Sequence, residues 1–169
     1  MIIISSALLV ILAILILLLS YSFAIGIIFG APYLPTLKDQ RQTALELLEL
    51  KPGQTLYDLG CGDGRMLKAA AERGLRAVGY ELSPLLALMA FLNNWRYRKQ
   101  VKVRWGNYWR ADLKEADGIY VFLLTKYMGK FDGLVKAKAK KGVKVASYTF
   151  KIPNKKPAAQ ANAVYLYRY

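Results

Sequence analysis

Hydrophobic and polar residues follow two different patterns along the chain. Residues 1–37 carry no charged side chain, and the run from Ile2 to Phe29 is predominantly apolar. Beyond it, short stretches rich in β-branched and aromatic residues alternate with segments of helical periodicity. Such alternation is typical of α/β folds, in which helices cover a largely parallel sheet. The pattern therefore predicts one apolar N-terminal helix followed by a single α/β domain.

The limits of the predicted elements come from capping and turn residues. Thr36 is followed three residues later by Asp39, a spacing that resembles a capping box, so we expect a helix from there to about Leu50. Further helices are predicted at 64–73, 84–94 and 126–140. Strands are predicted at 54–59, 76–81, 100–105, 117–124, 143–150 and 163–169, with a loop at 152–160.

A glycine-rich turn joins the first predicted strand of the domain to the next helix. Residues 58–64 read Asp-Leu-Gly-Cys-Gly-Asp-Gly. Glycine has no Cβ, so the backbone can approach a ligand, and the helix N-terminus offers free N–H groups to it. The spacing is not that of a dinucleotide fingerprint, because Arg65 stands at the third glycine position, and no P-loop string occurs. The turn therefore predicts a different kind of polar-ligand site.

A carboxylate ends the next predicted strand. Glu81 is placed there to accept hydrogen bonds from the two hydroxyls of a ribose. Together with residues 58–64, it resembles the class I, seven-strand, S-adenosylmethionine-dependent methyltransferases. The resemblance implies an α/β, Rossmann-like methyltransferase sheet with helices on both faces, and S-adenosyl-L-methionine as the cofactor. The alternative is a generic α/β turn with an incidental glutamate.

The same resemblance suggests further cofactor-binding residues. Asn107 stands where the family commonly has an adenine-binding aspartate, and Tyr108 is placed to cover the adenine ring; the alternative is a simple Gly-Asn turn. Tyr33 and Thr36 are expected near the methionine end of the cofactor. The expected cofactor-binding residues are Tyr33, Thr36, Asp58, Leu59, Gly60, Gly62, Asp63, Glu81, Leu82, Asn107 and Tyr108. No catalytic base is assigned.

Two further strings narrow the resemblance. Residues 32–36 read Pro-Tyr-Leu-Pro-Thr, and Trp109 is followed by Asp112-Leu113. With the motifs above, they resemble the small membrane-anchored lysine methyltransferases related to those of the ATP synthase c-subunit and the adenine nucleotide translocase. This implies protein-lysine N-methylation of a membrane protein. The alternatives are a lipid or quinone methyltransferase and a non-catalytic interaction protein.

Two further features of the sequence, one of them a departure from the family pattern, affect these expectations. The Asn/Asp-Pro-Pro-Tyr string of amino-methylating nucleic-acid enzymes is absent after the fourth domain strand, which disfavours RNA or DNA as the substrate without excluding it. The segment after Phe150 is too short for the helix and two strands that usually end a class I domain. We therefore expect a truncated C-terminal edge with one closing strand.

The apolar N-terminus predicts a membrane segment. About 20 apolar helical residues cross a bilayer core. We expect a transmembrane helix at 1–30, a connector at 31–36 and the methyltransferase domain at 37–169. Because the basic residues all follow the apolar run, the positive-inside rule predicts a single-pass membrane protein with its N-terminus outside and its catalytic domain cytoplasmic.

Charge and composition limit the remaining classes. The formal net charge is +14, and the chain has no histidine and one cysteine, Cys61. Histidine-based metal sites, His-dependent nucleophilic catalysis and an internal disulfide are excluded, and no metal is expected. The positive charge favours an anionic lipid surface, nucleic acid or simple solubility, and these stay open. Residues 85–92 are expected to pack on the sheet, and residues 95–99 to contact lipid or a membrane-embedded substrate.

Overall fold

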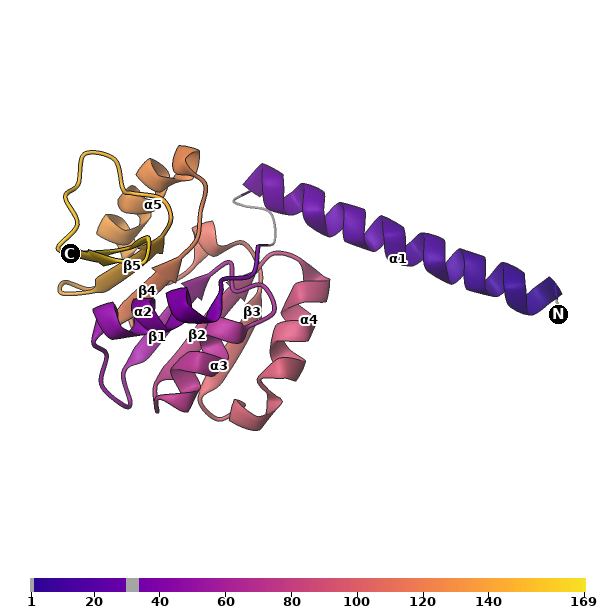
Figure 1. Ribbon diagram of the computed structural model, residues 1–169, viewed down its shortest axis with the longest axis horizontal. Helices are drawn as coiled ribbons and strands as arrows, with labels where there is room; N and C mark the ends of the chain where they lie inside the picture. The colour runs from indigo at the N-terminus through magenta and orange to yellow at the C-terminus, as the bar shows by residue number, and fades with distance from the viewer. Residues whose placement is uncertain (1, 30–33) are drawn as a thin grey trace.

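The fold is built on one seven-stranded sheet with helices on both faces (Figure 1). The computed structural model describes the backbone of residues 2–29 and 34–169, with side chains for 6–18, 20–21 and 34–169. The strands are β1 Thr55–Leu59, β2 Arg76–Glu81, β3 Val101–Trp105, β4 Gly118–Val121, β5 Lys144–Tyr148, β6 Ala159–Ala161 and β7 Val164–Arg168. The helices are α1 Ile2–Phe29, α2 Lys38–Leu48, α3 Arg65–Glu72, α4 Pro84–Asn93 and α5 Thr125–Lys138, with 3-10 turns η1 Trp95–Tyr97 and η2 Tyr108–Arg110.

The strand order is β3-β2-β1-β4-β5-β7-β6. Strands β1 to β5 are parallel, whereas β7 runs antiparallel to β5 and β6 antiparallel to β7. The order changes direction between β1 and β4, and open α/β sheets bind their ligands beyond the carboxyl ends of the strands at such a point. The topology thus places the glycine-rich turn, which follows β1, at the expected ligand-binding edge.

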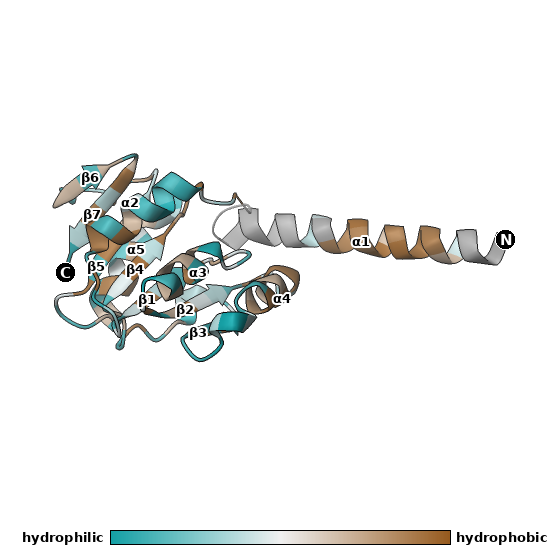
Figure 2. Ribbon diagram, turned by 60° about the horizontal axis from the view of Figure 1, so that its bottom comes forward, coloured by the Kyte–Doolittle hydropathy of each residue, from teal (hydrophilic) through white to brown (hydrophobic). Residues whose placement is uncertain are grey.

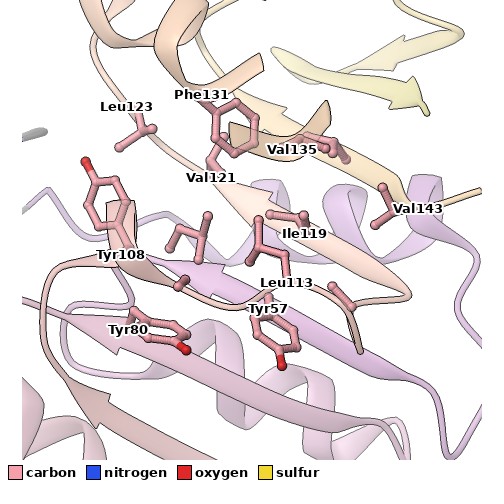
Figure 3. Close-up of a cluster of buried hydrophobic side chains, with 14 of the residues drawn as sticks. Tyr57, Tyr80, Tyr108, Leu113, Ile119, Val121, Leu123, Phe131, Val135 and Val143 are labelled. Atoms are coloured by element: carbon pink, nitrogen blue, oxygen red, sulfur yellow. The ribbon is translucent and has the colours of Figure 1, made fainter. Parts of the chain in front are cut away.

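The two faces of the sheet have separate cores. Because successive strand residues point to opposite faces, Ile119 and Val121 of β4 pack on the α5 side, against Phe131 (Figure 3). Tyr120, between them in sequence, belongs to the opposite core. That opposite core contains residues of α2, α3 and α4, including the fully buried Leu48. The predicted α/β architecture with helices on both faces is confirmed.

The N-terminus of α2 is not capped as predicted. The helix begins at Lys38, its N-cap residue is Leu37, and neither Thr36 nor Leu37 caps it through a side chain. The Thr36 hydroxyl instead lies 2.9 Å from the Tyr120 hydroxyl, across the domain. The capping-box prediction is therefore wrong, because a buried tertiary hydrogen bond uses the side chain that would have capped the helix.

The C-terminal edge also differs from the prediction. In place of one closing strand, β6 and β7 form a hairpin that completes the sheet. Its turn residues Asn162 and Ala163 have φ angles of 46° and 60°, the left-handed pair of a two-residue hairpin turn. Alanine gives no signal for this conformation, and β6 has only three residues. The truncation is limited to a missing helix, since residues 149–158 contain none.

The structure contradicts the predicted localisation. Helix α1 occupies Ile2–Phe29 and extends away from the domain (Figures 1 and 2), with side chains described for residues 6–18 and 20–21. Over the residues that the structure describes, no helix combines the length and the apolar character needed to cross a membrane. The expected single-pass arrangement, with the N-terminus outside and the domain cytoplasmic, is not supported.

Candidate cofactor site

The glycine-rich turn after β1 leaves its backbone open to a ligand. Gly60, Gly62 and Gly64 all have positive φ, at 97°, 54° and 80°, which only glycine adopts without strain. No atom lies within 4 Å of the position of a Cβ at Gly60, so that stretch of backbone faces open space. By contrast, a Cβ at Gly64 would meet the Asn94 amide nitrogen at 2.5 Å. Gly60 thus offers access, and Gly64 allows α3 to pack against α4.

Glu81 ends β2 and is held in place by the backbone. Its Oε2 accepts a hydrogen bond from the Gly62 N–H at 2.9 Å, and its Oε1 accepts one from the Ser83 N–H at 2.8 Å. Burial raises the pKa of this carboxyl, and hydrogen bonds from the backbone N–H groups of Ser83, Gly62 and Leu82 oppose that shift. An ionised carboxylate has about four lone-pair sites, so these backbone donors do not use all of them. The side chain therefore fixes the turn and retains acceptor capacity toward a ligand.

Asp58 brings a second buried carboxyl to the same edge of the sheet. It is 3% exposed, and it pairs with Tyr120 across β1 and β4. Burial and the charges of Glu81 and Asp63 raise the pKa of Asp58 to about 8. Three acidic side chains thus gather at one place in a chain of net charge +14. Such a cluster suits a ligand that carries positive charge.

The raised pKa predicts a pH-dependent stability. The carboxyl of Asp58 has an ordinary pKa near 3.8 and about 8 in the folded chain, so the folded state binds more protons between these values. The free energy of unfolding of the wild type should therefore fall from pH 4 to pH 8, relative to Asp58→Asn, by the order of a few kcal/mol. Urea unfolding at several pH values measures this difference. The exposed Asp39→Asn is the control, and a wild-type-minus-D58N difference that stays flat with pH contradicts the prediction.

Tyr120 and Arg41, to which the sequence assigned no role, contact Thr36 at this edge of the sheet, near α2. Tyr120 holds the Thr36 hydroxyl, and the Arg41 guanidinium donates to the Thr36 carbonyl oxygen. Thr36, expected near the methionine end of the cofactor, is thus fixed beside β4, whereas Tyr33 lies outside the described residues. Because 84 residues separate Thr36 from Tyr120, no local sequence pattern could have indicated the pair.

The residues expected around the adenine have structural partners. The Asn107 Oδ1 accepts a hydrogen bond from the Trp109 N–H at 3.0 Å and so caps the η2 turn. Tyr108 is 5% exposed and packs in the core on the α5 side, near Leu123 in Figure 3. The interpretation of Gly-Asn as a turn therefore describes part of what Asn107 does, and contacts of either residue with adenine stay a prediction.

The other predicted site residues, Leu59, Asp63 and Leu82, have contacts within the protein. Leu59 is a buried core residue on the α5 side of the sheet. Asp63 pairs with Arg65, whose Nη2 lies 2.6 Å from the Asp63 Oδ2. The Leu82 carbonyl accepts a hydrogen bond from the Trp105 indole at 3.0 Å. The structure thus groups Asp58, Gly60, Gly62 and Glu81 most closely, with Thr36 beside them through Tyr120.

Comparison with known proteins shows relatives of this chain. Residues 58–159 match the family described as the ANTKMT methyltransferase domain. The adenine nucleotide translocase lysine N-methyltransferase of Mus musculus is 34% identical over 131 residues, 76% of this chain and 57% of that protein. The lysine N-methyltransferase of the ATP synthase c-subunit from Xenopus laevis is 28% identical, over 73% of this chain and 55% of that protein. The chain thus spans little more than half the length of these relatives.

Two further matches cover more of the compared protein. A protein-lysine N-methyltransferase of Saccharolobus islandicus is 30% identical over 72% of this chain and 78% of that protein. The crystal structure of an RNA methyltransferase from Salinibacter ruber, in complex with S-adenosyl-L-homocysteine, has a TM-score of 0.74 and 30% identity over 80% of this chain and 92% of that one. The matches confirm the resemblance drawn from the sequence, except for its membrane-anchored aspect. The chain belongs to the ANTKMT methyltransferase domain family.

Proposed function

We propose that this protein is an S-adenosyl-L-methionine-dependent protein-lysine N-methyltransferase. The observation that carries the proposal is the edge where Asp58, Glu81 and the open backbone at Gly60 meet. Family membership and the names of the relatives agree with it. Residues 37–169 form the catalytic domain in this proposal, and residues 31–36 connect it to the preceding helix.

The residues at this edge each match one chemical group of the cofactor. Glu81 is held at the end of β2 and keeps acceptor capacity for the hydroxyls of a ribose. Asp58 is a buried acid whose ionised form gains from a positive ligand, and S-adenosylmethionine carries a sulfonium and an ammonium group. The φ of 97° and the empty space at Gly60 let the ligand lie against the main chain. In this proposal Leu59, Asp63, Leu82, Asn107 and Tyr108 line the same site.

The reaction needs alignment more than acid–base chemistry. The cofactor supplies a methyl group: the carbon–nitrogen bond to the acceptor forms as the carbon–sulfur bond breaks, and the bonding pair stays on sulfur. Asp58 and Glu81 fix the position of the bound molecule, so the acceptor must approach along one line. A lysine must first release its proton to solvent, and partial burial against the strand ends favours that loss by lowering its pKa.

A membrane protein is the acceptor we favour. Two relatives are named for the adenine nucleotide translocase and for the ATP synthase c-subunit. The test incubates cell membranes and the full-length protein with methyl-labelled S-adenosylmethionine, then hydrolyses the labelled band to amino acids. Methyl-lysine from a defined protein band, absent with Glu81→Ala, supports the proposal. Protease-resistant label that runs with lipids overturns the lysine assignment in favour of a lipid or quinone substrate.

RNA is the second candidate substrate. The Salinibacter ruber structure, which this chain covers over 92% of its length, is that of an RNA methyltransferase. The basic residues after Gly118, eleven against the single acid Asp132, suit a polyanion. A parallel incubation with total cellular RNA separates the two. Label in nuclease-sensitive material, with none in methyl-lysine, would assign the activity to RNA.

Helix α4 supports a role near anionic lipid, which belongs to the same proposal. Only its small residues Ala87 and Ala90 are buried, so the expectation that residues 85–92 pack on the sheet holds for one face alone. The ribbon of α4 is partly brown in Figure 2, because the helix is rich in apolar residues. Its exposed apolar side chains are Leu88, Met89, Phe91 and Leu92, followed by Trp95. Arg98 lies over the Trp95 ring, 5.2 Å from its centroid, and a groove of about 370 Å³ beside it is lined by Phe91, Lys102 and Arg104 among others.

Charge reversal tests this surface. The triple change Arg96→Glu, Arg98→Glu and Lys99→Glu should reduce the preference of the full-length protein for phosphatidylserine over phosphatidylcholine vesicles, since each nearby cation contributes about 1 kcal/mol. Co-sedimentation measures the ratio of bound fractions. The matched control reverses three exposed lysines elsewhere, Lys114, Lys141 and Lys156. An equal loss in both triple variants means that the total charge, and not the α4 surface, attracts the lipid.

A further inference from the structure

Three aromatic side chains lie together at the strand ends, outside the proposed cofactor site. Phe122 directly follows β4, Tyr148 is the last residue of β5, and Phe150 lies two residues further on. The ring centroids of Phe122 and Tyr148 are 4.7 Å apart, and those of Phe122 and Phe150 are 6.2 Å apart with an interplanar angle of 20°. All three side chains are half-buried. We call these residues the aromatic cluster.

The cluster lies next to the proposed cofactor site. Parallel pairing of β1 with β4 and of β4 with β5 brings their carboxyl ends to one edge. Tyr120, two residues before Phe122 and therefore on the same face of β4, pairs with Asp58 and bonds to Thr36. The cofactor residues occupy the β1 and β2 side of this edge, and the cluster occupies the β4 and β5 side. The cluster is therefore placed where it can hold a molecule that receives a group from the first side.

A strained residue holds the cluster together. Thr149, between Tyr148 and Phe150, has a φ of 68°, a left-handed conformation that is rare for a β-branched residue. Two contacts fix it there: the Thr149 N–H donates to the Ala163 carbonyl at 2.7 Å, and the Ser147 hydroxyl donates to the Phe150 carbonyl at 2.6 Å. The resulting turn directs Phe150 back over the Phe122 ring. Such strain persists where the surrounding structure imposes it, often at functional sites.

The chemistry of the cluster fits one kind of side chain. The faces of aromatic rings attract ammonium groups and cover the aliphatic stem of a long side chain. A carboxylate or phosphate has no such attraction to ring faces. Since the rings are half-exposed, a bound ammonium can release its proton to water before it reacts. An amine at the end of a flexible chain is thus the ligand that this surface selects.

We propose that Phe122, Tyr148 and Phe150 bind the side chain of the substrate lysine and orient its nitrogen toward the cofactor edge. The inference rests on the proposed lysine methyltransferase function and adds to it the residues that recognise the acceptor. It also predicts that the trimethylated side chain, which keeps its positive charge, binds to the same rings.

The first test measures ligand binding in place of catalysis. Saturation-transfer NMR with Nα-acetyl-trimethyllysine amide and the full-length protein, loaded with S-adenosylhomocysteine, should show contact at the N-methyl protons. The double change Phe122→Leu and Phe150→Leu keeps apolar bulk but removes the rings, so it should weaken binding about tenfold. Phe122→Trp combined with Phe150→Leu, which returns one aromatic ring to the cluster, should recover binding relative to the double leucine variant. Tyr169→Leu changes a half-buried aromatic that lies beside Gly142, at the opposite end of β5 from Tyr148; it is the matched control and should bind like wild type.

Calorimetric binding of S-adenosylhomocysteine separates failure of this inference from failure of the proposed function. If the wild type does not bind S-adenosylhomocysteine, the proposed function fails. If the wild type and every variant bind S-adenosylhomocysteine with equal affinity, and the loss of both phenylalanine rings leaves the N-methyl signal unchanged, the aromatic cluster is not the lysine site.

The variant Thr149→Gly is a second test, in which thermal stability and the affinity for the acceptor should change in opposite directions. Glycine removes the left-handed strain, so the thermal midpoint should rise, while the freed turn no longer holds Phe150 over Phe122. The KM for the labelled membrane acceptor should then rise several-fold with little change in the affinity for S-adenosylhomocysteine. A purely structural cluster would instead gain stability with an unchanged KM, and that result would overturn the proposal.

Discussion

Replacement of Glu81 by alanine is expected to abolish methyl transfer and to weaken S-adenosylmethionine binding by a factor of about 100 or more. Two hydrogen bonds from a ribose to a charged acceptor are each worth about 1.5–3 kcal/mol, and both are lost. The change also leaves the buried Gly62 and Ser83 N–H groups without their acceptor. Isothermal calorimetry with S-adenosylmethionine and the membrane-labelling assay measure the two effects.

Two further variants distinguish the possible causes of the Glu81→Ala result. Glu81→Gln keeps an oxygen acceptor for one of the two N–H groups, so it should retain more stability than Glu81→Ala while still losing affinity. Glu115→Ala removes an exposed acid at a distance from the site and should behave like wild type. If Glu81→Gln binds S-adenosylmethionine normally, the carboxylate serves the turn alone and does not hold the ribose.

Gly64→Ala is expected to destabilise the fold by about 3 kcal/mol. The φ of 80° is unfavourable for alanine, and the new Cβ would lie 2.5 Å from the Asn94 Nδ2 and 3.0 Å from the Ala90 Cα. Asn94 would have to leave the Gly64 and Ala90 carbonyls, to which its amide now donates at 3.0 and 2.8 Å. Urea unfolding at constant pH measures the loss.

Two other glycines separate the causes of that loss. Gly142 has a φ of 87° but no atom within 4 Å of a new Cβ, so Gly142→Ala should cost only the backbone strain, about 1 kcal/mol. Gly129 lies inside α5 with open space around it, so Gly129→Ala should stabilise by about 0.5–1 kcal/mol through helix propensity. If Gly64→Ala costs no more than Gly142→Ala, α3 and α4 do not depend on close approach.

The sequence predicted what is encoded locally. Five parallel strands, the glycine-rich turn and the carboxylate of Glu81 follow from short runs of residues, and each was placed within a few positions. The β6–β7 hairpin was not predicted, because Ala163 adopts a left-handed conformation that an alanine in the sequence does not indicate. The prediction that Thr36 caps α2 was wrong, because the Thr36 hydroxyl bonds instead to a residue 84 positions away. Local patterns predict elements, and tertiary hydrogen bonds decide how some of their side chains are used.

The same distinction applies to the site. Asp58 and Glu81 were found because motif and strand end coincide with them in sequence, whereas Tyr120 and Arg41 carry no motif. The aromatic cluster was interpreted only as strand residues, since Phe122 and Phe150 meet only when β4 and β5 pair and Thr149 turns the chain. Its discovery needed the register of the sheet, which a single sequence does not specify.

The gathering of Asp58, Asp63 and Glu81 has a consequence for turnover. S-adenosylmethionine carries one more positive charge than the thioether that it becomes, because the methyl group leaves without the bonding pair. The acidic neighbours that raise the pKa of Asp58 therefore attract the incoming molecule more strongly than the spent one. In the proposed function, the loss of that charge therefore favours exchange of the spent cofactor for a fresh one.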